Sequence, residues 1–139
     1  MIAPHARTLI MTAIGYTIMS EVVSGSLNAT EVYTPWMPRM GNNMTNVFEV
    51  IAIGGTDAQI TVDVLEKNSE DTGEGTVKSA VNNSRTSTGV TSFRLTDCKE
   101  LVRYRIKLGT QFEPSGTYKL HVHFRVLAPS WETTGAQGV

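Results

Sequence analysis

The segment that decides the fold class is Thr117-Tyr-Lys-Leu-His-Val-His-Phe-Arg-Val-Leu127, in which polar and apolar side chains alternate from Thr117 to Val126. Successive side chains of a β-strand point to opposite faces, so this alternation predicts a strand that buries one face in a core. The residues expected to point inward are Tyr118, Leu120, Val122, Phe124 and Val126, and those expected to point outward are Lys119, His121, His123 and Arg125.

Other segments have strand character too. Residues 101–108 and 59–66 alternate in the same way, and residues 47–53 form a nearly continuous apolar run that is typical of a buried strand. The short connection at 54–58 predicts that these last two strands form a hairpin. Further extended segments are expected at 9–23, 30–34 and 91–95. Six to eight strands joined by polar turns predict an all-β fold, an antiparallel β-sandwich for which a jelly roll is one candidate topology.

The chain of 139 residues is long enough for one domain, and we expect a single β-sandwich over residues 1–139. Within it, residues 1–8 and 129–139 are expected to form terminal arms. Residues 67–90 are mostly polar and predict a long loop, in which Val77 and Val81 could anchor one helical turn.

Charge and cysteine content narrow the classes of function. The net charge of −1 argues against a nucleic-acid partner, and the lone Cys98 excludes both an intrachain disulfide and a cysteine-rich zinc site. The apolar stretch 9–23 is too short and too polar for a membrane span, and the N-terminus lacks the pattern of a signal peptide. We therefore expect a protein made in the cytoplasm, with neither a nucleic-acid nor a membrane partner.

No catalytic motif is recognisable in the chain. His121 and His123 lie two residues apart on one predicted strand and could share a metal, with His5 or a carboxylate as a third ligand. Zinc sites normally have four ligands, so two solvated histidines on a polar face are the simpler interpretation. We predict no catalytic, metal-binding or cofactor-binding residue, no cofactor, and no enzymatic activity.

The outward positions of the two longest alternating strands are basic or titratable. If these strands pair, they form one positive face that could meet an acidic partner surface or phosphate, made of Arg103, Arg105, Lys107, Lys119, His121, His123 and Arg125. Alternatively, Glu49 and Asp63 on neighbouring strands balance the face through cross-strand ion pairs.

Both tryptophans lie next to prolines, in Tyr33-Thr-Pro-Trp-Met-Pro-Arg39 and Ala128-Pro-Ser-Trp131. Exposed tryptophans can anchor an interface or stack on a sugar ring. Alternatively, each tryptophan plugs one end of the sandwich.

Three segments, Tyr33–Arg39, Val47–Ile53 and Phe124–Trp131, resemble small structural proteins of tailed-phage virions, in particular head decoration (cement) proteins. The resemblance lies in size, style and order of elements over most of residues 30–131. It implies a β-rich, often trimeric protein on the outer capsid lattice, where it holds neighbouring subunits together.

The function expected from this resemblance is that of a non-enzymatic virion protein that binds and stabilises the capsid lattice. Its partners would be the major capsid protein and further copies of itself, as a homotrimer. The candidate interface residues are Trp36, Arg39, Trp131, Arg103, Arg105, Lys107, Lys119 and Arg125. Two alternatives remain: a tail or neck component of the same particle, and a carbohydrate-binding sandwich that uses Tyr33, Trp36 and Trp131.

Overall fold

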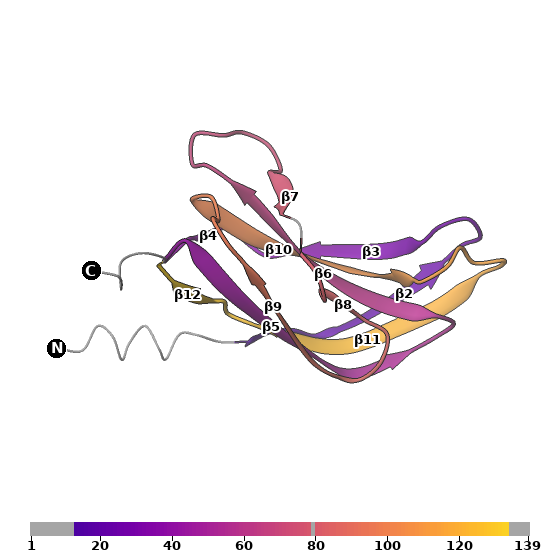
Figure 1. The fold of residues 1–139 in the computed structure, drawn as a ribbon. Helices are drawn as coiled ribbons and strands as arrows, with labels where there is room; N and C mark the ends of the chain where they lie inside the picture. Colours follow the sequence, from indigo (N-terminus) through magenta and orange to yellow (C-terminus); the bar gives the residue numbers. More distant parts are fainter. Residues whose placement is uncertain (1–12, 79, 134–139) are drawn as a thin grey trace.

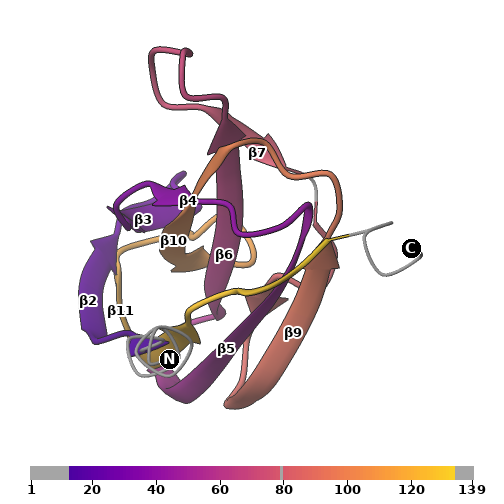
Figure 2. The same ribbon diagram turned by 90° about the vertical axis from the view of Figure 1, so that its left-hand side faces the viewer.

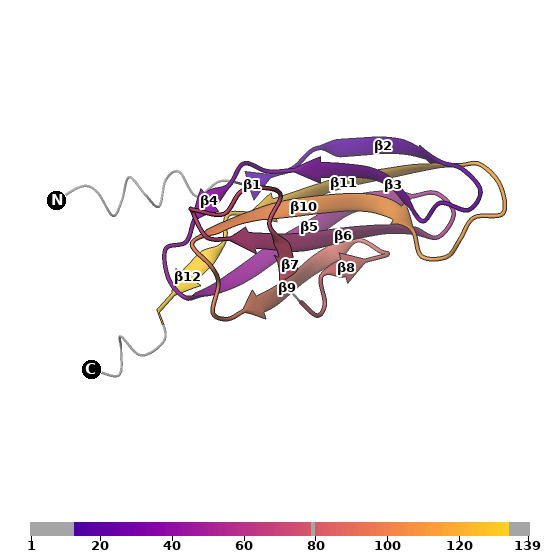
Figure 3. The ribbon, with the colours of Figure 1, turned by 90° about the horizontal axis from the view of Figure 1, so that it is seen from above.

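The computed structural model describes residues 13–78 and 80–133, and in these residues antiparallel strands form two sheets without any helix (Figure 1). The predicted antiparallel β-sandwich is therefore confirmed. Seen from above, the strands of both sheets run along the same long axis of the molecule (Figure 3). No helix that could cross a membrane occurs in the described part of the chain.

The first sheet is centred on two long neighbouring strands, β11 and β5, which pair from Phe48 opposite Val126 onward. Both β1 and β2 pair with β11, whereas β9 pairs with the other edge of β5. The short β12 continues the line of β11 along β5. The bounds are β1 (Ala13–Ile14), β2 (Thr17–Val22), β5 (Asn43–Gly54), β9 (Gly89–Leu95), β11 (Tyr118–Leu127) and β12 (Ser130–Glu132).

The second sheet is centred on β10 and β6, which pair over their whole length. On the far side of β10 lie β3 and β4, and on the far side of β6 lie β7 and β8. The bounds are β3 (Asn28–Tyr33), β4 (Met37–Pro38), β6 (Ala58–Lys67), β7 (Thr76–Lys78), β8 (Ser84–Arg85) and β10 (Leu101–Thr110).

The described strands have the order of a jelly roll. The order is β2–β11–β5–β9 in one sheet and β3–β10–β6–β7 in the other, and the chain crosses repeatedly between the sheets. This is the two-Greek-key arrangement of eight strand positions. It includes the crossings from β5 to β6 and from β10 to β11, which are consecutive strands in opposite sheets.

The predicted hairpin between residues 47–53 and 59–66 is therefore wrong. Gly55 helps the chain to leave one sheet for the other, because its φ of 112° is a conformation that favours glycine. A Cβ at Gly55 would also lie 2.6 Å from the carbonyl oxygen of Lys119. Both strands bury a face in the same core, but from opposite sides of it.

The core lies between the sheets, which enclose it when the molecule is viewed along the strands (Figure 2). The residues of 101–108 whose alternation predicts an inward side chain are all fully buried, namely Val102, Tyr104, Ile106 and Leu108. Those of 117–127 are buried except for Tyr118 at the margin. Each large apolar side chain buried in this way contributes about 1.5–3 kcal/mol to folding. One polar pair lies among them, because the Tyr104 hydroxyl donates a hydrogen bond to Asn46 Oδ1 at 2.5 Å.

Two expectations about loops and arms need correction. Residues 67–90 do not form one loop, because β7 and β8 pair with β6 and supply the edge of their sheet. Val77 lies in strand β7, so it does not anchor the helical turn that was expected at Val77 and Val81. The C-terminal arm cannot begin at residue 129, since β12 pairs with the start of β5. Residues 1–8 and 134–139 lie outside the described residues.

Candidate interaction surfaces

The outward side chains of β10 and β11 lie on opposite outer faces of the sandwich. Neither strand pairs with the other, because β10 belongs to the second sheet and β11 to the first. The condition for a single positive face is therefore not met. The two strands face each other across the core through their apolar sides, which directs their charged sides away from one another.

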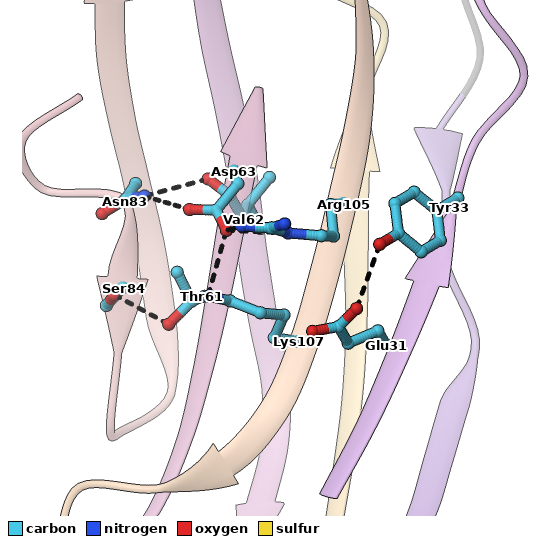
Figure 4. Close-up of polar contacts among 9 residues, drawn as sticks. All are labelled: Glu31, Tyr33, Thr61, Val62, Asp63, Asn83, Ser84, Arg105 and Lys107. Atoms are coloured by element: carbon cyan, nitrogen blue, oxygen red, sulfur yellow. Dashed lines mark hydrogen bonds and ion pairs between the residues drawn. The ribbon is translucent and has the colours of Figure 1, made fainter. Parts of the chain in front are cut away.

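On the outer face of β6 and β10, the basic residues surround one buried carboxylate (Figure 4). Asp63 Oδ2 lies 2.7 Å from Arg105 Nη2 and 3.1 Å from Lys107 Nζ. Asn83 Nδ2 donates to Asp63 Oδ1 at 3.1 Å. Burial alone lowers the pKa of Arg105, but the hydrogen bond to Asp63 and its charge outweigh burial and raise that pKa. The charges of Arg105 and Lys107 are therefore paired with Asp63 within the molecule.

The first sheet has a comparable but more exposed pair. Arg125 Nε lies 2.8 Å from Glu49 Oε1, on strands β11 and β5 that lie side by side. The interpretation that Glu49 and Asp63 balance the basic residues through cross-strand pairs is therefore confirmed. Lys119 lies on the same face as Arg125 and is paired in register with Glu21 of β2.

Trp36 lies on the outer face of the second sheet, in a cation–π cluster formed by Tyr33, Trp36, Lys67 and Arg103. Arg103 Cζ lies 4.6 Å from the ring centroids of both Tyr33 and Trp36, and Lys67 Nζ lies 4.7 Å from that of Trp36. Glu74 accepts a hydrogen bond from Arg103 Nη2 at 2.6 Å. Trp36 therefore does not plug an end of the sandwich.

Trp131 has a different environment. It lies in β12 opposite Met44 and packs against the hydrophobic core from the first sheet. The two tryptophans thus belong to different sheets and form no common surface.

Arg39, another candidate interface residue, already has a partner within the chain, because its Nη1 donates a hydrogen bond to the carbonyl oxygen of Cys98. Cys98 is buried, and this burial raises the pKa of its thiol.

The sequence interpretation missed a set of exposed apolar residues on the outer face of the first sheet. We call this set the apolar outer face: Met19 (78% exposed), Ile51 (47%), Val90 (60%) and Leu127 (37%). In register, Met19 is opposite His121 and Val90 is opposite Glu49. Ile51 lies at a register shift between β5 and β11, where an extra residue is accommodated as in a β-bulge.

A signal for this face was present in the alternation itself. Leu127 is an even number of residues from Lys119 and Arg125, so its side chain points outward as theirs do. Ile51 belongs to the apolar run that was expected to form a buried strand. Met19 and His121 also line a shallow hollow together with Lys119.

The two histidines lie on this outer face. His123 Nδ1 is 3.2 Å from Thr17 Oγ1, and the His121 ring lies over Gly54. Within residues 13–78 and 80–133, no group of three or more His, Cys, Asp or Glu side chains could hold a metal ion. His5 lies outside the described residues.

Comparison with known proteins gives no match, either to a protein-family model or to a curated protein sequence. The chain's own fold and surfaces are therefore the basis for a functional proposal.

Proposed function

We propose that this protein is a non-enzymatic virion structural protein that assembles in several copies and binds a capsid lattice as a decoration protein. The jelly-roll order supports the proposal, since viral capsid proteins commonly use this architecture. Lectins and cupins share it, so the fold by itself does not define the function. The observation that carries the proposal is the apolar outer face.

The apolar outer face has the composition of a contact surface. Met19 and Val90 are each more than half exposed, although such side chains gain free energy when they leave water. Exposed apolar groups that share one face of a sheet are a feature of protein–protein interaction sites. The Arg125–Glu49 pair lies within this face, with Glu49 opposite Val90, and the pair of Arg94 with Glu132 lies near its β9 margin.

The basic residues contribute less to the proposed binding surface than the sequence indicated. Asp63 already pairs with Arg105 and Lys107, and Glu74 with Arg103. A partner would have to break these pairs to use the charges, whereas the apolar outer face offers its side chains free of such contacts. Many weak contacts of this kind, repeated over a lattice, give high avidity.

The test of self-assembly is the solution mass, measured by light scattering during size exclusion. We expect a trimer or larger closed oligomer that dissociates in the double variant Met19→Glu, Ile51→Glu. Val81→Glu is a matched control, because Val81 is 76% exposed but lies outside this face. A monomeric wild type, or equal loss in the control, would contradict assembly through the apolar outer face.

The virion part of the proposal needs a second measurement. Particles purified by density gradient from cells that express the chain should contain its peptides in mass spectrometry. Their absence from such particles would contradict a virion role even if the protein is oligomeric.

The carbohydrate-binding alternative has less support. Tyr33 and Trp36 have cations over their rings, and Trp131 packs against the core from the other sheet. These three aromatics therefore form no common stacking platform. A glycan array with the wild type and Trp36→Ala tests this alternative directly, and specific binding that is lost in the variant would favour it.

A further inference from the structure

The longest strand at a margin of either sheet in the described chain is β9, and no second strand pairs with its outer edge. Figure 2 shows β9 at one margin of its sheet and β2, next to β3, at the opposite margin. Arg85 of β8 reaches the start of β9 from the second sheet. The Ser20 hydroxyl is hydrogen-bonded to that of Thr30 and ties β2 to β3. On the second sheet, β7 and β8 are only three and two residues long. The seven residues of β9 pair with β5 alone.

Two hydrogen bonds show which residues of β9 point their backbone N–H and C=O groups away from β5. Arg85 Nη1 donates to the carbonyl oxygen of Val90 at 3.3 Å, and Asn46 of β5 donates to that of Phe93 at 3.4 Å. The backbone N–H and C=O of Val90 therefore point away from β5, and those of Phe93 point toward it. Because the N–H and C=O of one residue point the same way and successive residues alternate, Ser92 and Arg94 also present theirs to the open edge.

We infer that β9 is a strand-addition site for β9 of a second copy of this chain, paired antiparallel about a two-fold axis at Ser92. Ser92 is the central residue of Gly89–Leu95, so this register pairs the whole strand. It places Ser92 opposite Ser92, Val90 opposite Arg94, and Thr91 opposite Phe93. A two-fold contact uses the same surface on both copies, which requires such self-complementarity.

The charges favour this register over its neighbours. Pairing centred on Arg94 would place two guanidinium groups directly opposite one another, which destabilises a strand pair. In the Ser92 register the small serines meet at the axis, and Arg94 lies beside the exposed Val90 of the other copy. The Val90 carbonyl has two lone pairs, so it can accept a further bond while Arg85 holds it.

The usual protections of a free edge are weak in β9. Natural edge strands are blocked by proline, by bulges, by charge or by a covering segment. β9 contains no proline, and its one charged residue, Arg94, is paired with Glu132 of the same chain. Arg85 covers only the start of the strand, where it also donates to Thr88 O and Thr91 Oγ1.

Cysteine cross-linking tests the register. In the Ser92 register, the Cα atoms of the two Ser92 residues lie about 5.5 Å apart, within the range that a disulfide can bridge. Those of the two Arg94 residues lie about 14 Å apart, which is too far. On mild oxidation we expect Ser92→Cys to give a reducible dimer, whereas Arg94→Cys and the wild type, with its buried Cys98, remain monomeric on a denaturing gel.

Two results would overturn the inference: no dimer with Ser92→Cys, or a dimer formed equally well with Arg94→Cys. A charge variant gives an independent measurement. Ser92→Lys places two ammonium groups at the two-fold axis, and it should raise the dissociation constant of the β9–β9 contact at least about fivefold. Thr117→Lys adds the same charge at an exposed position outside β9 and should leave the association unchanged. Equal effects of both variants would contradict pairing at β9.

This contact can be distinguished experimentally from the assembly proposed above, although Val90 belongs to both. The double variant Met19→Glu, Ile51→Glu in the Ser92→Cys background should keep the cross-link, because neither residue lies on β9. Failure of the apolar outer face and failure of β9 pairing therefore give different results.

Discussion

At the residue scale, Tyr104 is a polar side chain placed in the middle of an apolar core. It is fully buried, and its hydroxyl donates to Asn46 Oδ1. Burial raises the pKa of the phenol above its ordinary value, because the charged phenolate cannot be solvated there. The hydrogen bond satisfies a group that would otherwise be costly to bury.

This raised pKa makes stability depend on alkaline pH. Its contribution is fully present below the ordinary tyrosine pKa of about 10 and is lost as pH rises above it, because the unfolded chain loses the proton first. Tyr104→Phe should reduce the free energy of unfolding by about 1–2 kcal/mol at pH 8, since Asn46 Oδ1 loses its donor. Between pH 9 and 11 the wild type should lose more stability than the variant in urea unfolding. Parallel curves for the two proteins would contradict this prediction.

Two glycines of the β6–β7 connection differ in a testable way. Gly73 and Gly75 both have positive φ, at 95° and 79°. A Cβ at Gly75 would lie 2.7 Å from Trp36 Cη2 and 2.8 Å from the carbonyl oxygen of Glu66, whereas one at Gly73 meets no atom within 4 Å.

We therefore expect Gly73→Ala to cost about 1 kcal/mol, from backbone strain alone. Gly75→Ala should cost about 2–4 kcal/mol, because the cation–π cluster and the β6 backbone must also shift. Thermal unfolding of the two variants measures the difference. Equal losses would indicate that Trp36 moves away freely.

At the scale of elements, the two central strand pairs carry ion pairs of unequal burial. The side chains of Asp63 and Arg105 are 9% and 21% exposed, whereas those of Glu49 and Arg125 are 33% and 53% exposed. In double-mutant cycles with alanine, we expect a coupling energy of about 1–3 kcal/mol for the first pair. The second pair should give less than about 1 kcal/mol and lose most of it in 1 M salt. A stronger coupling in the exposed pair would contradict the prediction.

The two tryptophans stabilise different elements. Trp131 ties β12 to the core, so Trp131→Ala should cost about 3–5 kcal/mol in chemical unfolding. Trp36 lies on the outer face against Lys67 and Arg103, and Trp36→Ala should cost only about 1–2 kcal/mol. The reverse order of losses would mean that the outer cluster is the more important of the two.

At the scale of the whole molecule, one core joins both sheets, because consecutive strands repeatedly cross between them. Neither sheet can bury its apolar face without the other, so unfolding should be a single cooperative transition. The tryptophans report on one sheet each. In Trp36→Phe, fluorescence follows the first sheet, and in Trp131→Phe it follows the second. In each variant the midpoint should coincide with that of far-UV circular dichroism, and separate midpoints would indicate independent sheets.

The proposals also belong to this scale. A decoration role depends on the apolar outer face as a whole, and β9 pairing depends on an edge that only the assembled sheet creates. Neither could be predicted from the residues singly. Met19, Val90 and Ile51 lie far apart in the chain, and they share a face only because β2, β5 and β9 belong to one sheet.

The sequence by itself determined the longest strands and the direction of their side chains, but not the short strands β7, β8 and β12. Alternation in 101–108 and 117–127 predicted which residues enter the core, because the period of two is a local property of an extended backbone. The tertiary structure decided which strands pair. Thus β5 crosses to β6 instead of forming a hairpin, and β10 and β11 direct their basic residues to opposite faces. Strand pairing depends on packing between residues distant in the chain, where alternation is the same for every possible partner.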